Sequence, residues 1–241
     1  MKSALLSDVH ANLEALQAVL KVVDERGAGR IFCLGDVVGY GASPNECLKL
    51  IRERCQLVLL GNHDSAASGG PEAARFNPNA RAAALWTART LTPDNRDYLR
   101  ALSPSKKIDP YLYVHASPAA PRDWEYIFDR FDAEPQFQFF AEPACFIGHT
   151  HQPAIFERTP SGCVSLPPTR LQFDPNRRYI VNVGSVGQPR DRDPRACFVL
   201  LNEPAADIEC VRVPYDIEAA QEKIQAARLP LVLATRLATG E

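Results

Sequence analysis

Three short apolar runs alternate with helix-like segments in the first sixty residues, and this alternation restricts the chain to few folds. The apolar runs predict strands at residues 4–7, 30–34 and 57–60. Between the first two, apolar residues recur at helical spacing at Leu13, Leu16, Leu20 and Val23. A β-α-β-α-β order of this kind predicts parallel strands joined by crossover helices.

Further helices are expected in the middle of the chain. Ser43-Pro44-Asn45-Glu46 has the order of a capping box with proline at the first helical position, so a helix should begin there. Residues 65–103 are rich in alanine and arginine, and they predict two helices, at roughly 79–91 and 94–102. Two interpretations of this segment stay open: a rim or cap over a site, or a layer packed on the sheet.

The second half of the chain is rich in strand patterns. Apolar, β-branched runs separated by Pro and Gly are typical of a meander, with strands at 111–114, 145–147, 154–157, 179–183, 196–201 and 208–213. A C-terminal helix is expected at 217–227. Residues 118–143 are rich in aromatic side chains, which more often serve core or helix packing than a ligand platform. We expect one domain, 1–241, with two sheets and flanking helices.

Composition indicates a globular protein without a bias toward nucleic acid or membranes. The formal charge of 241 residues is −2, which gives no support to a nucleic-acid partner. No run approaches the ~20 apolar residues that span a bilayer, and the apolar N-terminal stretch is too short for a signal peptide. Seven cysteines without C-x-x-C spacing favour reduced thiols, so we expect a cytoplasmic location. The sequence specifies no oligomeric state.

All five histidines stand in short polar motifs beside predicted strand ends. The motifs are Asp8-Val9-His10, Gly61-Asn62-His63-Asp64, Val114-His115 and Gly148-His149-Thr150-His151, and Leu34-Gly35-Asp36 adds a further acid. Each motif alone is also compatible with a polar turn. Together they place imidazole, carboxylate and carboxamide groups after several strands, where open α/β sheets bind ligands.

These side chains form the ligand set of a two-metal hydrolytic site. Asp8 and His10 are two residues apart, so extended geometry would place both on one face and on one ion. His149 and His151 have the same spacing and could each reach a different ion. Asp36 would bridge, and Asn62 would add a neutral oxygen. His63 is then free to protonate a leaving oxygen, with Asp64 orienting it.

The order of these motifs resembles the calcineurin-like metallophosphoesterase superfamily, in particular its small prokaryotic phosphodiesterase-like members. Ser7-Asp8-Val9-His10-Ala11-Asn12, residues 182–190 and the closing Arg236-Leu237-Ala238-Thr239-Gly240 extend the resemblance over nearly the whole chain. It implies an α/β fold, a four-layer α-β-β-α sandwich with two central mixed sheets. It also implies His63 as the catalytic histidine. One metal would be held by Asp8, His10, Asp36 and His151, and the other by Asp36, Asn62, His115 and His149.

One departure from the family pattern bears on the substrate. Protein-phosphatase members carry Asp-Arg shortly after the Gly-Asp motif, where this chain has Gly39-Tyr40. Phosphate binding must therefore come from elsewhere. Arg190 in the loop after residue 183 is a candidate, and so are the backbone N–H groups of that loop. An ion-paired loop arginine is the competing interpretation of Arg190.

The resulting hypothesis is a hydrolase that depends on two divalent metal ions and cleaves a small phosphodiester or nucleotide. A metal-bridging hydroxide would attack, and His63 would assist the leaving group. The ligands suit Mn, Fe, Zn, Co or Ni, and we favour Mn. The expected partner is a small phosphorylated substrate. A phosphomonoesterase or protein Ser/Thr phosphatase is the alternative enzyme, and a metal-bound scaffold or regulatory subunit is the non-enzymatic alternative.

Overall fold

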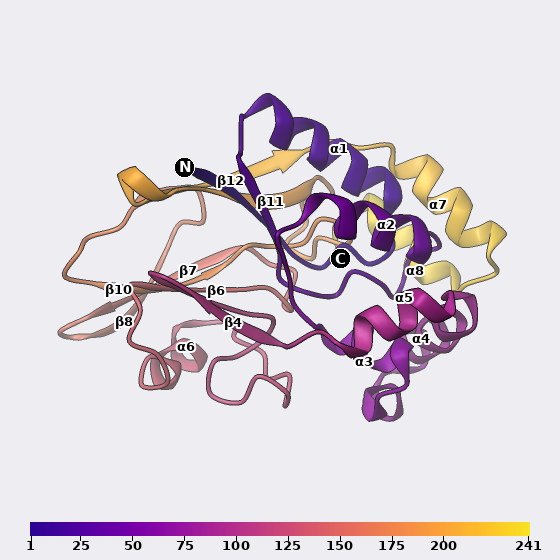
Figure 1. The fold of residues 1–241 in the computed structure, drawn as a ribbon, viewed down its shortest axis with the longest axis horizontal. Coiled ribbons are helices and arrows are strands. Elements are labelled where there is room, and N and C mark those ends of the chain that lie inside the picture. Colours follow the sequence, from indigo (N-terminus) through magenta and orange to yellow (C-terminus); the bar gives the residue numbers. More distant parts are fainter.

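Two six-stranded mixed sheets pack face to face with helices on their outer faces in a computed structural model that describes residues 1–241 (Figure 1). This is the α-β-β-α arrangement that the family resemblance implies. Along the first sheet the strand order is β3-β2-β1-β11-β12-β9, and along the second it is β4-β5-β6-β10-β7-β8. Neither order follows the sequence, so segments far apart in the chain become neighbours within each sheet.

The first sheet contains the predicted β-α-β-α-β run. Its parallel part consists of β1 (Lys2–Leu6), β2 (Arg30–Cys33) and β3 (Leu57–Val58), connected by α1 (Leu13–Glu25) and α2 (Pro44–Arg54). Antiparallel strands complete it: β11 (Ala196–Asn202) on β1, then β12 (Asp207–Val213) and β9 (Arg170–Gln172).

The second sheet differs from the expected meander. Its strands are β4 (Ser105–Ile108), β5 (Tyr111–Val114), β6 (Ala144–Ile147), β7 (Ala154–Thr159), β8 (Gly162–Leu166) and β10 (Arg178–Asn182). Adjacent β5, β6 and β10 run parallel, and β10 lies between β6 and the β7–β8 hairpin. β6 and β10 are therefore interior strands of this sheet and are largely buried. Their apolar composition agrees with an interior position.

The remaining helices lie around the sheets. The two helices predicted within 65–103 are confirmed as α4 (Pro78–Thr90) and α5 (Pro93–Arg100). The predicted C-terminal helix is α7 (Ile217–Ala226), which lies beside α1 (Figure 1). Helices that the sequence analysis did not predict are α3 (Asn62–Ser68), α6 (Arg130–Gln136) and α8 (Leu231–Thr235). Short 3-10 segments are η1 (Pro71–Arg75), η2 (Glu203–Ala205) and η3 (Arg236–Ala238). None of the helices is both long and apolar enough to cross a membrane.

A side chain caps the N-terminus of α1, but the capping box expected at the N-terminus of α2 does not form. The Asn12 side chain accepts a hydrogen bond from Ala15 N and so caps α1. Ser43 precedes α2 as predicted, but its side chain makes no capping hydrogen bond, so the expected capping box is absent. Pro44 alone marks that start, because proline fixes the first helical residue without needing an N–H partner.

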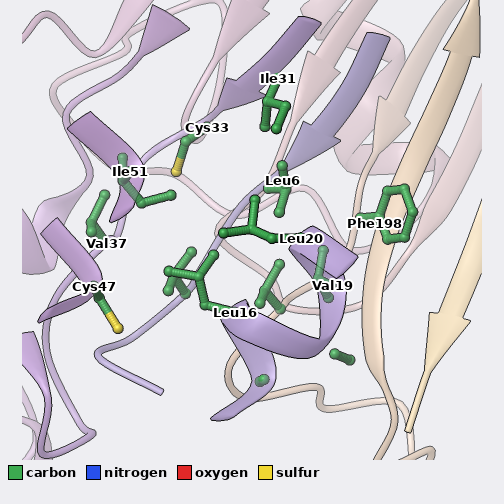
Figure 2. Packing of buried hydrophobic residues seen from close by; sticks show 14 of the residues in the cluster. Leu6, Leu16, Val19, Leu20, Ile31, Cys33, Val37, Cys47, Ile51 and Phe198 are labelled. Atoms are coloured by element: carbon green, nitrogen blue, oxygen red, sulfur yellow. The ribbon is translucent and has the colours of Figure 1, made fainter. Parts of the chain in front are cut away.

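Apolar packing on both faces of the first sheet fixes the arrangement of layers. On its outer face, Leu16, Val19 and Leu20 of α1 point toward strand residues such as Leu6 and Phe198 (Figure 2). Between the sheets a second cluster includes Leu5, Phe32, Tyr113, Phe146 and Val199. This inter-sheet core joins the strands whose ends carry the polar motifs.

Replacing Phe198 should reveal how much the outer core contributes to stability. Its side chain is fully buried in the cluster against α1, so Phe198→Ala should lower the free energy of unfolding by about 3–5 kcal/mol. Phe131→Ala is the matched control, because Phe131 is 70% exposed and its loss should change stability by no more than about 0.5 kcal/mol. Chemical denaturation of the two variants measures both values, and equal effects would contradict the packing described.

Candidate metal centre

The predicted ligands converge at one edge of the sandwich, where strands of both sheets end. Asp8, Asp36 and Asn62 follow β1, β2 and β3 of the first sheet, and His115 and His149 follow β5 and β6 of the second. His10 and His151 complete the set. The exposed fractions of these seven residues lie between 0% and 6%, so the groups are almost completely shielded from water.

The carboxylates and imidazoles form two groups, each compact enough to hold one ion. Asp8, His10 and His151 make the first group, and Asp36, His115 and His149 make the second. Within each group the ligand atoms all lie within 4.8 Å of one another. Both groups combine residues from both sheets, and His149 and His151 fall into different groups as the sequence predicted.

Asp36 lies at the junction of the two groups. Its Oδ2 is 3.5 Å from His115 Nε2 in its own group and 3.7 Å from His10 Nε2 in the other. Its Oδ1 accepts a hydrogen bond from His63 N at 2.8 Å. Gly61 packs so closely on Asp36 that a Cβ at this position would collide with the carboxylate. One Asp36 oxygen is therefore fixed by the backbone, and the other points to both groups.

Backbone carbonyls determine which nitrogen each histidine presents to the centre. The Nδ1–H groups of His10, His115 and His151 donate to Val38 O at 3.1 Å, Leu34 O at 2.8 Å and Gln188 O at 2.7 Å. In His149 the roles are reversed, and Nε2–H donates to Trp124 O at 2.9 Å. A carbonyl can only accept, so the other nitrogen of each ring is free to bind a metal, as in protein sites where a second contact orients the ligand.

Several polar atoms of the centre are buried without a hydrogen-bond partner. Four of them belong to predicted ligands: Asp8 Oδ1, Asp36 Oδ2, Asn62 Oδ1 and His115 Nε2. Buried polar atoms are nearly always paired, so four unpaired ones among the predicted ligands require a specific cause. Divalent cations would satisfy all four, and the mixture of carboxylate, carboxamide and imidazole fits Mn, Fe, Zn, Co or Ni.

The protonation of the ligands also fits cation binding. Burial lowers the pKa of His149 to about 4 and that of His151 to about 3, so both imidazoles are neutral at pH 7. Burial alone would lower the pKa of His115, but the Asp36 carboxylate outweighs it and raises that pKa to about 9. A cation at His115 Nε2 would replace this proton, because both neutralise the same buried carboxylate.

The loops that carry the ligands have unusual backbone geometry. Asp8, His10, Asp36, His149 and His151 all have positive φ angles, between 49° and 69°. Each such residue costs on the order of 1–3 kcal/mol, and the surrounding structure must supply that energy. Our expectation that Asp8 and His10 share a face through extended geometry is therefore wrong. β1 ends at Leu6, and left-handed turns bring the two side chains together.

His63 lies beside the ligands and is held by aromatic packing. Its ring centroid is 4.4 Å from that of Tyr40, 4.5 Å from that of Phe76 and 5.0 Å from that of His10. Gly39 provides the space, since a Cβ there would lie 2.7 Å from His63 Nδ1. Burial lowers the pKa of His63 well below its usual value, although the Asp36 carboxylate opposes this shift. An anionic phosphate bound beside the ring would favour the protonated form that a general acid needs.

Asp64 does not orient His63. Its Oδ1 accepts from Val38 N at 3.0 Å and its Oδ2 accepts from Gly61 N at 3.1 Å. Asp64 thus closes the N-terminus of α3 and connects it to the loop after β2. Burial and the charge of Asp36 raise its pKa to about 7 despite these two bonds. The sequence pattern His-Asp suggested a catalytic pair, but the helix that begins at Asn62 directs the carboxylate to the backbone.

Arg190 lies at the rim of the centre without a carboxylate partner. Its Nη2 donates to Gln188 Oε1 at 2.8 Å, and its Cζ is 5.5 Å from the ring centroid of Tyr40. Its Nε is buried and unpaired. Arg190 takes part in none of the ion pairs of the structure, whereas its neighbour Asp191 pairs with Arg212 of β12. The ion-paired interpretation of Arg190 therefore does not describe this geometry.

Aromatic residues of the 118–143 segment contribute to the centre, contrary to the expectation that they serve packing. Phe137 and Phe140 are indeed buried under the second sheet. Trp124, however, orients His149 through its carbonyl, and the Tyr126 ring stacks on His149 with centroids 4.1 Å apart. The sequence held no period that separates these two groups, because the segment up to Asp129 has no regular secondary structure.

Comparison with known proteins agrees with this architecture. The model of the calcineurin-like phosphoesterase superfamily domain matches residues 1–204. An uncharacterised protein of Methanocaldococcus jannaschii is 40% identical over 98% of this chain and 97% of its own length. A metallophosphoesterase structure from Sphaerobacter thermophilus is 39% identical with a TM-score of 0.89, covering 100% of this chain and 99% of that one. A hypothetical protein structure from Pyrococcus horikoshii shares the fold at 21% identity, with a TM-score of 0.80 and coverage of 100% and 98%.

Replacing Asp36 tests whether one carboxylate serves both groups. Asp36→Asn should weaken both metal sites together, by at least about 10–100-fold in affinity, because the variant loses the charge shared by the two groups. Asp8→Asn is the matched control and should remove chiefly the ion of the first group. Elemental analysis after dialysis measures the ions retained, and two ions per chain in Asp36→Asn would contradict the bridging position.

Proposed function

Because the chain belongs to the calcineurin-like phosphoesterase superfamily, we propose that it hydrolyses small phosphodiesters or nucleotides with two bound divalent metal ions. The observation that carries this proposal is Asp36 Oδ2, which lies within 3.7 Å of a histidine nitrogen in each ligand group. Two ions bound in this way would lower the pKa of a water ligand towards ~7 and stabilise charge on the phosphoryl oxygens. Mn²⁺ is the ion we favour for the assay.

His63 is suited to assist the leaving group. It is the one histidine outside the two ligand groups, and its ring lies 5.0 Å from that of His10. Tyr40, Phe76 and Gly39 restrict the movement of the His63 ring. The ring therefore loses little conformational entropy when it is oriented for the reaction. A scaffold or regulatory subunit would have no need of a confined histidine at this place, which favours the enzyme over that alternative.

The rim favours a small substrate over a phosphoprotein. By the family resemblance, Gly39 and Tyr40 take the positions at which protein-phosphatase members carry Asp-Arg. In this chain both residues pack on His63. The indole Nε1–H of Trp124 donates to Glu72 Oε1 at 3.3 Å, so the loop that orients His149 is also joined to η1. A panel of cyclic nucleotides, dinucleoside polyphosphates and phosphopeptides separates the diesterase from the phosphatase alternative.

Removing the His63 imidazole should abolish most turnover without removing metal. In Mn²⁺-loaded protein, His63→Ala should hydrolyse bis-p-nitrophenyl phosphate with kcat lowered about 10²–10⁴-fold, the range expected for loss of a general acid. Elemental analysis of the same sample serves as the control and should still find two ions. A variant with normal kcat would exclude the proposed role of His63.

Arg190 should matter through its charge at the rim. Arg190→Ala should lower kcat/KM for the same diester about 10–100-fold, because a charge-assisted hydrogen bond contributes about 1.5–3 kcal/mol. Arg192→Ala is the matched control, since Arg192 is exposed and belongs to the same loop. Steady-state kinetics of both variants decide the point, and equal values of kcat/KM would place phosphate binding elsewhere.

A further inference from the structure

Two neighbouring aromatic side chains extend outward from the metal centre as a stack. The Tyr126 and Phe128 rings are nearly parallel, at 10°, with centroids 5.2 Å apart. Tyr126 lies in turn on His149, at 17° and 4.1 Å. The three rings thus lead from a predicted metal ligand to the surface.

The two outer rings remain open to solvent although they are large and apolar. Tyr126 is 47% exposed and Phe128 is 53% exposed, whereas Ile127 between them is 2% exposed and belongs to the core under the second sheet. Parallel rings in contact are about 3.5 Å apart, so a centroid distance of 5.2 Å means a sideways offset of about 4 Å. The offset leaves part of each ring face uncovered.

The backbone of this segment is held in place at both ends, so the stack is preformed. Trp124 O accepts from His149 at 2.9 Å on one side. On the other side, Phe128 N donates to Asp132 Oδ2 at 3.0 Å, and Asp129 caps α6. A preformed aromatic surface binds a planar ring without first having to become ordered.

We propose that Tyr126 and Phe128 form a stacking platform for the nucleobase of a nucleotide substrate whose phosphate binds at the metal centre. The inference rests on the proposed function, because it names one group of the substrate for that site. Stacking suits this place because the Tyr126 ring contacts His149, a member of one ligand group. The ribose of a nucleotide could therefore connect a base on the platform to a phosphate at the metal centre.

Aromatic stacking recognises a base by its ring face and is tolerant of its identity. The platform offers two ring faces, and the only polar side-chain atom of Tyr126 and Phe128 is the single tyrosine hydroxyl. The substrate class we infer is therefore nucleoside phosphates in general. The site should discriminate weakly among the bases, and it should bind a nucleoside phosphate more tightly than a sugar phosphate that has no base.

The test compares two ligands that differ only in the base. Titration calorimetry on Mn²⁺-loaded protein measures Kd for AMP and for ribose 5-phosphate, with chromatography confirming that both stay intact. AMP should bind about tenfold more tightly in the wild type, as expected for stacking of one base. Phe128→Ala should reduce that ratio about threefold or more and leave the Kd of ribose 5-phosphate unchanged.

Phe131→Ala is the matched control, because Phe131 is an exposed aromatic residue of the same segment and is not part of the stack. It should keep the ratio of the wild type. A ratio near one in the wild type, or an unchanged ratio in Phe128→Ala, would overturn the platform. Light scattering tests the alternative that the Phe128 ring packs on a second copy of the chain. If Phe128→Ala lowers the mass of an oligomer, that alternative holds and the platform is likewise overturned.

Hydrolysis of bis-p-nitrophenyl phosphate by the wild type, measured in parallel, separates this inference from the proposed function. Hydrolysis together with a ratio of one rejects the platform and leaves the hydrolase standing. A high ratio that depends on Phe128, without hydrolysis of any diester, rejects the hydrolase and keeps a nucleotide-binding site at the same place.

Discussion

The buried carboxylate of Asp36 is the interaction on which the rest of the structure depends. A charge at this depth is tolerated only with compensation, and here imidazoles from two sheets and a backbone N–H surround it. Burial alone would raise the pKa of Asp36, but the charge of His115 and the hydrogen bond with that ring hold it well below its usual value. The ionised form is therefore the stable one, and the ligand groups on either side are arranged around it.

The geometry of the ligands is obtained from the backbone, at a cost. Left-handed residues at five ligand positions direct the side chains inward, and four carbonyls fix the imidazole tautomers. Neither device belongs to a helix or a strand. The regular elements supply the energy that makes them possible, since the clusters on both faces of the first sheet hold the loop ends in place.

The sequence was sufficient for what depends on local patterns and insufficient for what depends on distant contacts. Apolar periodicity located the β-α-β-α-β run, and polar motifs after strands located the ligands, because strand ends of parallel sheets meet at one edge. The order of the second sheet was not predictable, since insertion of β10 beside β6 depends on pairing between segments more than thirty residues apart. The contacts of Asp64 and the left-handed turn at Asp8 likewise depend on neighbours from other loops. Tyr126 and Phe137 belong to one aromatic segment, and only the fold shows which of them lies at the centre.

Each ligand group takes members from both sheets, and this has a mechanical consequence. Asp8 and Asp36 move with the first sheet, and His115, His149 and His151 move with the second. The distance between the first-sheet and second-sheet ligands within each group is therefore set by the thickness of the apolar layer between the sheets, where Phe32, Tyr113 and Phe146 lie. That layer acts as a spacer, so a change of volume in residues that never touch the substrate alters the ligand spacing at both ions.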